Sequence, residues 1–148
     1  MIKTFRGLIV DGGQDTIVLH TNDGSVGYRI VKFQLMAASP AAVTQESIGK
    51  IYKVQQTTID GTVDFSDNTL LASGLYILSD NSNQIWNTTE TVIFDNEIFN
   101  QDIYVTHKDV GAIAAASINY YIELEQIKLD LSENTVATLK DIRNKHNL

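Results

Sequence analysis

The chain has 148 residues, of which 43% are hydrophobic and 20% are charged, the balance of a globular domain and not of a disordered chain. It contains no cysteine, which excludes a disulfide framework, a thiolate nucleophile and a thiolate metal site. The net charge of −7 disfavours nucleic acid and anionic membranes as partners. A chain of this length buries about 68–70% of its unfolded surface, so one domain over residues 1–148 is expected.

No stretch of the sequence approaches the ~18 consecutive apolar residues of a membrane span. The first six residues, Met1 to Arg6, lack the apolar run of a signal peptide. We therefore expect a protein that is made in the cytoplasm and binds no membrane.

Short β-branched and aromatic runs between Gly, Asn and Asp turns predict a series of strands. Residues 5–10 and 16–20 are the first two, and each is followed by a turn with an Asp-Gly pair. Residues 26–36 form the clearest strand. Its apolar positions change parity after Ile30, which predicts a β-bulge or a strand buried on both faces.

The remaining strands are shorter, except for residues 119–131, which are predicted to form the longest strand of the chain. Residues 59–65 are interpreted as a strand edge with a turn, and Ser66 and Asp67 as the cap of a short helix over residues 70–72. The other predicted strands are residues 48–54, 75–78, 84–86, 91–94 and 103–106.

The last segment has a helical period. After Ser132, a good N-cap, the apolar residues Val136, Leu139 and Ile142 lie on one face, which predicts an amphipathic helix over about residues 132–145. Many short strands followed by one helix predict a mainly β fold, an antiparallel β-sandwich or jelly roll with a C-terminal amphipathic α-helix.

Asp60, Asp64 and Asp67 form the densest acidic cluster, in a loop that contains Gly61. Carboxylates in such a loop can hold a hard cation such as calcium. The spacing matches no EF-hand loop, and aspartate is also the ordinary residue of turns and caps. Turn formation is the preferred interpretation, with these three residues as the weak metal candidates.

Glu123 and Glu125 lie two residues apart in a predicted strand and share a face. Paired carboxylates carry out glycoside hydrolysis, although such pairs usually converge from different strands. Alternation with Ile122 and Leu124 fits a half-buried strand with a solvated face. His20, His107 and His146 are isolated, and no named catalytic or nucleotide-binding motif is present, so we expect no catalytic residue and no cofactor.

Ten aromatic residues could line a sugar or peptide groove, but most occupy strand positions where a core needs them, so packing is the preferred interpretation. They are Phe33, Tyr52, Phe65, Tyr76, Trp86, Phe94, Phe99, Tyr104, Tyr120 and Tyr121.

Four segments carry a resemblance to a known group of proteins: residues 27–36, 60–67, 94–107 and 119–144. The chain resembles small proteins encoded by marine bacteriophages that are structural components of the virion. The similarity extends over nearly the whole chain and rests on fold-forming residues, so it implies a class of protein and supplies no catalytic residues.

The resemblance implies a virion protein and does not distinguish the capsid from the tail. The first hypothesis is a non-enzymatic decoration or cement protein that binds and stabilises the major capsid lattice in the virion. It would be a homotrimer or another closed oligomer, with contacts from Met1 to Arg6 and from the C-terminal helix. Two alternatives stay open. One is a tail or fibre component that binds host glycans near Trp86, and the other is a carbohydrate-active enzyme that uses Glu123 and Glu125.

Overall fold

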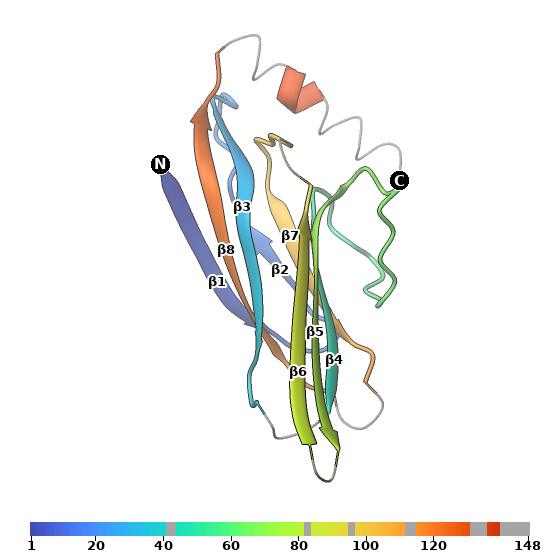
Figure 1. The fold of residues 1–148 in the computed structure, drawn as a ribbon. Coiled ribbons are helices and arrows are strands. Elements are labelled where there is room, and N and C mark those ends of the chain that lie inside the picture. The colour runs from blue at the N-terminus through green and yellow to red at the C-terminus, as the bar shows by residue number, and fades with distance from the viewer. Residues whose placement is uncertain (41–43, 82–83, 95–96, 112–114, 131–135, 140–148) are drawn as a thin grey trace.

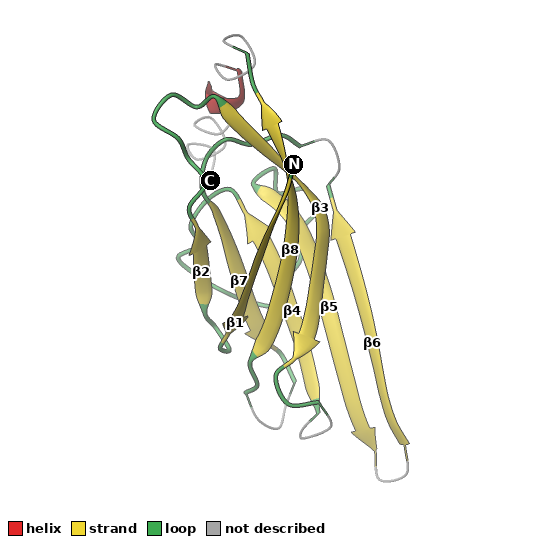
Figure 2. Cartoon of the chain, turned by 90° about the vertical axis from the view of Figure 1, so that its left-hand side faces the viewer, coloured by secondary structure: helices red, strands yellow, loops and turns green. Residues whose placement is uncertain are grey.

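The computed structural model describes residues 1–40, 44–81, 84–94, 97–111, 115–130 and 136–139, with the side chains of residues 80, 81 and 84–86 excepted. The described chain forms two antiparallel sheets that face each other (Figures 1 and 2). This confirms the prediction of a mainly β, antiparallel fold.

The three-stranded sheet has the order β1-β8-β3, with β1 at Ile2–Ile9, β8 at Ile118–Lys128 and β3 at Val26–Ala37. The five-stranded sheet has the order β2-β7-β4-β5-β6. Its strands are β2 (Gln14–Ile17), β7 (Ile103–Asp109), β4 (Gln45–Tyr52), β5 (Leu70–Asn81) and β6 (Gln84–Ile93). Seen face on, β6 lies beyond the side of the smaller sheet that ends in β3 (Figure 2).

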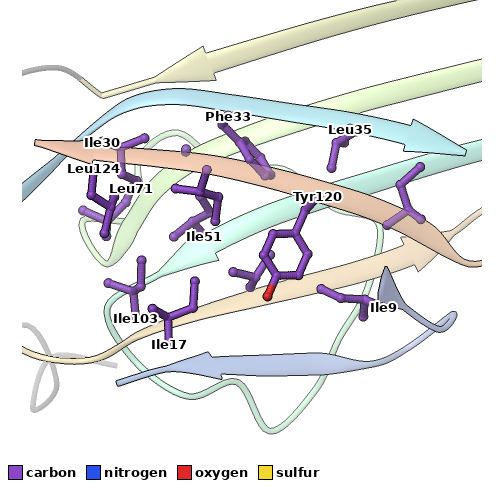
Figure 3. Close-up of a cluster of buried hydrophobic side chains, with 14 of the residues drawn as sticks. Ile9, Ile17, Ile30, Phe33, Leu35, Ile51, Leu71, Ile103, Tyr120 and Leu124 are labelled. Carbon is purple, nitrogen blue, oxygen red and sulfur yellow. The ribbon is translucent and has the colours of Figure 1, made fainter. Parts of the chain in front are cut away.

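The core fills the space between the two sheets (Figure 3). It is built by alternate residues of each strand, because side chains of a strand point to opposite faces in turn. On β8, for example, Ile118, Tyr120, Ile122 and Leu124 are buried, while the residues between them are half-buried on the outer face. One continuous cluster therefore joins both sheets.

The parity change in β3 is a β-bulge. Ile30 pairs with Leu124 and Lys32 pairs with Glu123, which leaves Val31 as the extra residue. Ile30 and Phe33 consequently both face the core, and each is less than 10% exposed. Of the two alternatives predicted from the sequence, a β-bulge or a strand buried on both faces, the structure confirms the bulge.

Three sequence-based predictions about elements after residue 58 are wrong. Residues 59–65 form no strand, because they belong to the loop that joins β4 to β5. Residues 70–72 form no helix and instead begin β5, where Leu71 and Ala72 are buried between strands. Strand β8 has 11 residues, so it is shorter than β3 and β5 with 12 each.

Of the predicted C-terminal helix, the structure describes residues 136–139, which are helical; the rest of the range lies outside the described residues. The predicted apolar stripe does not face the core there. Val136 is 65% and Leu139 is 56% exposed, whereas Ala137 is buried. Thr138 accepts a hydrogen bond from Asn100 and ties this turn to the loop before β7. Among the described residues, no helix combines the length and apolar character needed to cross a membrane.

Candidate functional site

Asp60 serves as an anchor for the loop between β4 and β5. Its carboxylate lies 3.3 Å from the ammonium group of Lys50 and accepts the backbone N–H of Thr62 at 3.0 Å. The Lys50 ammonium also donates to the carbonyl of Thr62 at 2.6 Å and lies over the ring of Tyr52. Lys50 is a buried cation, so it needs these partners. Asp60 therefore neutralises a cation of the protein itself.

Asp64 and Asp67 form local turns. The carboxylate of Asp64 accepts the backbone N–H and hydroxyl of Ser66 at 2.9 and 2.6 Å, and these bonds lower the pKa of Asp64. Asp67 accepts the same two groups from Thr69. The structure thus places the three aspartates in separate bonding arrangements. Within the described ranges, no three histidine, aspartate or glutamate side chains gather as metal ligands would.

Removing the Asp60 charge is expected to lower the free energy of unfolding by about 1–2 kcal/mol, because Asp60→Asn leaves the buried Lys50 ammonium with a weaker set of partners. Asp64→Asn is the matched control. Its carboxylate accepts from Ser66 in an exposed turn, so a smaller effect than that of Asp60→Asn is expected. Urea denaturation of the two variants measures both values, and equal effects would contradict the anchoring role of Asp60.

Glu123 and Glu125 lie on the outer face of the three-stranded sheet. Glu125 pairs with Arg29 of β3, whose guanidinium nitrogen is 2.5 Å away, and both side chains are more than a third exposed. Glu123 accepts the hydroxyl of Tyr121 at 2.8 Å. The two carboxylates are neighbours along one solvated face, each with a different partner. This is the geometry expected for a solvated strand face and not for a pair that converges on a cleft.

A buried polar arrangement involves His107 on β7, which is fully buried. Its Nδ1 lies 3.0 Å from the carbonyl oxygen of Ile9 and 3.2 Å from that of Val10. Carbonyls only accept, so Nδ1 carries the proton and the neutral ring accepts at Nε2. The Ser47 hydroxyl, 2.8 Å from Nε2, is therefore the donor. Burial lowers the pKa of His107, which keeps the ring neutral.

This serine–histidine pair has the contact geometry of an activated nucleophile. Ser47 and His107 are both 0% exposed, however, and Gln45 donates to the Ser47 oxygen at 2.6 Å from within the core. The hydroxyl therefore has no contact with solvent. The network instead links β4, β7 and the end of β1. It holds the two sheets together at this end.

The other two histidines take no part in this network. His20 is exposed, and its ring nitrogen lies 2.7 Å from the Asp102 carboxylate. Burial acts to raise the pKa of Asp102, but hydrogen bonds from the His20 ring and the backbone N–H groups of Leu19 and His20 outweigh it, so the pKa is lowered. Asp102 thereby caps the segment after β2. His146 lies outside the described residues.

The aromatic side chains serve mainly as core, as predicted. Five of the ten are buried, three are half-buried and Phe65 is exposed at 55%, packing edge-on against Phe94. Trp86 belongs to β6, but its side chain lies outside the described part of the structure. The glycan-binding interpretation at Trp86 stays a prediction.

Apolar side chains are exposed on the outer face of the three-stranded sheet. Leu8 of β1 and Met36 of β3 lie on either side of Asn119 in the register, and they are 56% and 64% exposed. Ile2, at the other end of β1, is 51% exposed. This face therefore combines the paired charges of Arg29 and Glu125 with apolar side chains that can contact another surface.

A groove of about 620 Å³ extends from the three-stranded sheet to β6. On the side of the smaller sheet it is lined by residues of β1, β8 and β3, among them Phe33 and Leu35, and on the other side by Thr89 and Thr91 of β6. Thr89 and Thr91 are exposed although their register partners on β5 are buried. The inward face of β6 is thus left uncovered where the smaller sheet ends.

No protein family model matches this chain. A stretch of 92 residues is 29% identical to the urease accessory protein UreD of Microcystis aeruginosa. The match covers 61% of this chain and 30% of that protein, so the chain spans less than a third of the relative's length.

Two features of the surface and core were not predicted from the sequence. The groove depends on the order of the strands, which short sequence patterns do not determine. His107 did carry a signal, because Ile103, Val105, His107 and Asp109 share one parity along β7 and all are buried. Ile103 and Val105 precede His107 at alternate positions of the same strand. Their apolar side chains would have predicted that His107 faces the core with them.

Proposed function

We propose that the protein is a non-enzymatic structural protein of a virus particle, a decoration or cement protein that binds the major capsid lattice as a closed oligomer. The observation that carries the proposal is that the polar residues considered as possible sites bond to other parts of the same fold. Asp60, Glu125, His107 and Ser47 are engaged in bonds that hold the fold together. What the described surface offers to a partner is shape, apolar side chains and a strand edge.

The strand order supports a jelly-roll assignment, which is part of the proposal. A jelly roll builds two facing sheets from eight strands by successive crossings between them. Here the chain crosses from one sheet to the other between β1 and β2, between β2 and β3, between β3 and β4, and between β7 and β8, whereas β4 to β7 all lie in the larger sheet. Strand β6 departs from the pattern because it stays beside β5 in the larger sheet.

A protein of this kind gains firm attachment by repetition. Many copies on a symmetric lattice convert weak individual contacts into strong binding through effective concentration. A net charge of −7 suits the outside of a shell, away from the phosphates of the packaged genome. The resemblance to virion proteins of marine bacteriophages supports the same role.

The test is retention on particles of a phage that encodes this chain. The protein is expected to remain on washed particles at a fixed ratio to the capsid protein, and its absence from them would contradict the proposal. Leu8→Lys combined with Met36→Lys is expected to weaken binding to particles at least about tenfold, since two apolar contacts are lost. Val18→Lys, at a position that is 66% exposed elsewhere, is the matched control.

The partial similarity to a urease accessory protein favours a second candidate, an accessory role in relation to a urease. A pull-down with purified urease subunits distinguishes the two roles, because a capsid-binding protein is expected to retain none. The tail or fibre alternative and the glycosidase alternative stay predictions. The placement of Glu123 and Glu125 on a solvated face with separate partners weighs against the glycosidase.

A further inference from the structure

We propose that the free edge of β3 is a docking site for an extended segment of a partner protein. The segment would add to the three-stranded sheet as a fourth strand and cover the inward face of β6. This inference rests on the proposed binding role and assigns it a site.

The direction of the backbone groups on β8 shows which groups of β3 are free. In an antiparallel pair, residues that exchange hydrogen bonds with one neighbour alternate with residues that point both groups the other way. The N–H of Gln126 donates to the carbonyl of Met1, so Gln126 points toward β1. Ile122 and Tyr120 share its parity, and therefore they also point toward β1 and away from β3.

Phe33 lies opposite Ile122, and Leu35 lies opposite Tyr120. Because these partners turn toward β1, the N–H and C=O groups of Phe33 and Leu35 point to the open side of the sheet, along the groove. In the described part of the chain, β8 is the only strand that pairs with β3. The edge therefore offers two donors and two acceptors in the spacing that another strand matches.

Tyr28 demonstrates that this edge accepts an antiparallel partner. Its N–H donates to the carbonyl of Phe99 at 2.8 Å, and the N–H of Phe99 donates back at 2.9 Å. The two rings also stack, with centroids 6.4 Å apart. The chain itself thus occupies one end of the edge with a single residue. The stretch from Phe33 to Ala37, about 13 Å long at the usual rise of a strand, has no such partner among the described residues.

The overhang of β6 determines what kind of partner fits. Two copies joined along β3 would bring both β6 strands into the same space, because each larger sheet extends past β3 on that side (Figure 2). A single strand avoids this collision. It would lie beside β3 with one face toward Thr89 and Thr91, completing a four-stranded sheet over the larger one. Strand addition to an incomplete sheet is a known mode of protein recognition.

The lining of the groove specifies the side chains of that strand. Inward positions meet Phe33 and Leu35 on one side and the methyl and hydroxyl groups of Thr89 and Thr91 on the other, so small β-branched residues fit them. Outward positions would stand beside Lys32 and Gln34, which are exposed on the outer face of β3. An acidic residue is favoured there, because it would face Lys32 across the new strand pair.

Hydrogen exchange of the free protein tests the premise. The amides of Phe33 and Leu35 are expected to exchange at least about 100-fold faster than that of Gln34, which bonds to β8, although all three belong to one strand. Slow exchange at both Phe33 and Leu35 would mean that the edge is already occupied, and it would overturn the proposal.

Binding is tested with a synthetic eight-residue peptide of alternating valine and glutamate. Saturable binding is expected, with slowed exchange at Phe33 and Leu35. The same peptide N-methylated on the residues that face β3 keeps its side chains but loses its donors, and it is expected to bind at least about tenfold more weakly. Equal binding of the two peptides would overturn the proposal.

Two variants test whether the peptide binds in the groove. Thr91→Arg and Thr89→Arg fill the groove from exposed positions, and each is expected to abolish protection of Leu35 by the peptide. Thr88→Arg is the matched control, because Thr88 is exposed on the opposite face of the same strand. Circular dichroism confirms that the variants are folded. Peptide binding that survives both groove variants would place it elsewhere and refute the site.

The particle assay keeps this inference separate from the proposed function. If the protein binds particles while the peptide fails to protect Leu35, the docking site is wrong and the virion role stands. If the peptide protects Leu35 but the protein is absent from washed particles, the site stands and the virion role is wrong.

Discussion

Acidification from about pH 7.5 to about pH 5 is expected to destabilise the wild-type protein more than a His107→Gln variant. The cause is the buried ring of His107, whose Nε2 must accept the hydroxyl proton of Ser47. A proton on Nε2 turns this acceptor into a donor. The Ser47 oxygen already accepts from Gln45, and the Ser47 proton would lose its acceptor. Protonation in the folded state thus costs hydrogen bonds as well as the burial of a charge.

The direction of the effect follows from the pKa. Burial lowers the pKa of His107 in the folded protein below its ordinary value of 6.5, outweighing the carbonyls of Val10 and Ile9 and the carboxylates of Asp11 and Asp109, which act to raise it. Below pH 6.5 the unfolded chain binds this proton more readily than the folded chain does. The contribution of His107 is therefore fully present above pH 6.5 and is lost as the pH falls toward the lowered pKa, at no more than about 1.4 kcal/mol per pH unit.

Urea denaturation at several pH values measures this loss. His107→Gln is expected to be less stable than wild type by about 1–3 kcal/mol at pH 7.5, because it imperfectly replaces the buried bonds, and to have a flatter profile between about pH 6.5 and pH 5. His20→Gln replaces an exposed histidine in the same way and is the control for a histidine-to-glutamine change outside the core. Parallel profiles for wild type and His107→Gln would contradict the assignment of the slope to His107.

The fold was predictable from the sequence where the pattern was local. The parity change after Ile30 predicted a bulge or a strand buried on both faces, and the structure has the bulge, which lets Ile30 and Phe33 face one core. The Asp-Gly pair at Asp11 and Gly12 predicted the turn after β1, where Gly12 has a φ of 76°. The bulge and the turn each depend on a few neighbouring residues, so a short stretch of sequence is enough to predict them.

The errors occurred where distant residues decide the structure. Gly74 in the middle of β5 resembles a break in a strand, but a Cβ there would lie 2.9 Å from Leu35 on the facing sheet. The glycine is present because the sheets approach closely, which only the folded arrangement reveals. The loop between β4 and β5 was likewise mistaken in part for a strand. Lys50 of β4 holds this loop through hydrogen bonds to Asp60 and to the carbonyl of Thr62. The β propensity of the loop residues gives no sign of these contacts.

The candidate site was less predictable than the fold. The groove and the free edge of β3 exist because β6 pairs with β5 and leaves the smaller sheet with three strands. Strand order depends on which edges find partners after the chain has collapsed, and local sequence carries little of that information. The acidic residues, which composition made conspicuous, are instead explained by short-range bonds such as those from Asp64 to Ser66.

The same dependence on distant contacts makes Gly7 a sensitive position. Gly7 of β1 pairs with Tyr120 of β8, and a Cβ on Gly7 would lie 2.7–2.8 Å from three atoms of the Tyr120 side chain. That side chain has little freedom to move, since it is 6% exposed and its hydroxyl donates to Asp15 at 3.0 Å. Gly7→Ala is therefore expected to lower the free energy of unfolding by about 1–3 kcal/mol, although alanine ordinarily suits a strand better than glycine.

A double-mutant cycle with Tyr120→Leu separates this contact from any general effect on β1. Tyr120→Leu alone is expected to destabilise, because it removes a buried ring and the bond to Asp15. On that background, Gly7→Ala is expected to cost less than about 0.5 kcal/mol, since the atoms that it meets are gone. Thr4→Ala, at an exposed position of the same strand, is the control for alanine in β1. If Gly7→Ala costs the same with and without the tyrosine ring, the ring is not the reason that β1 requires glycine at this position.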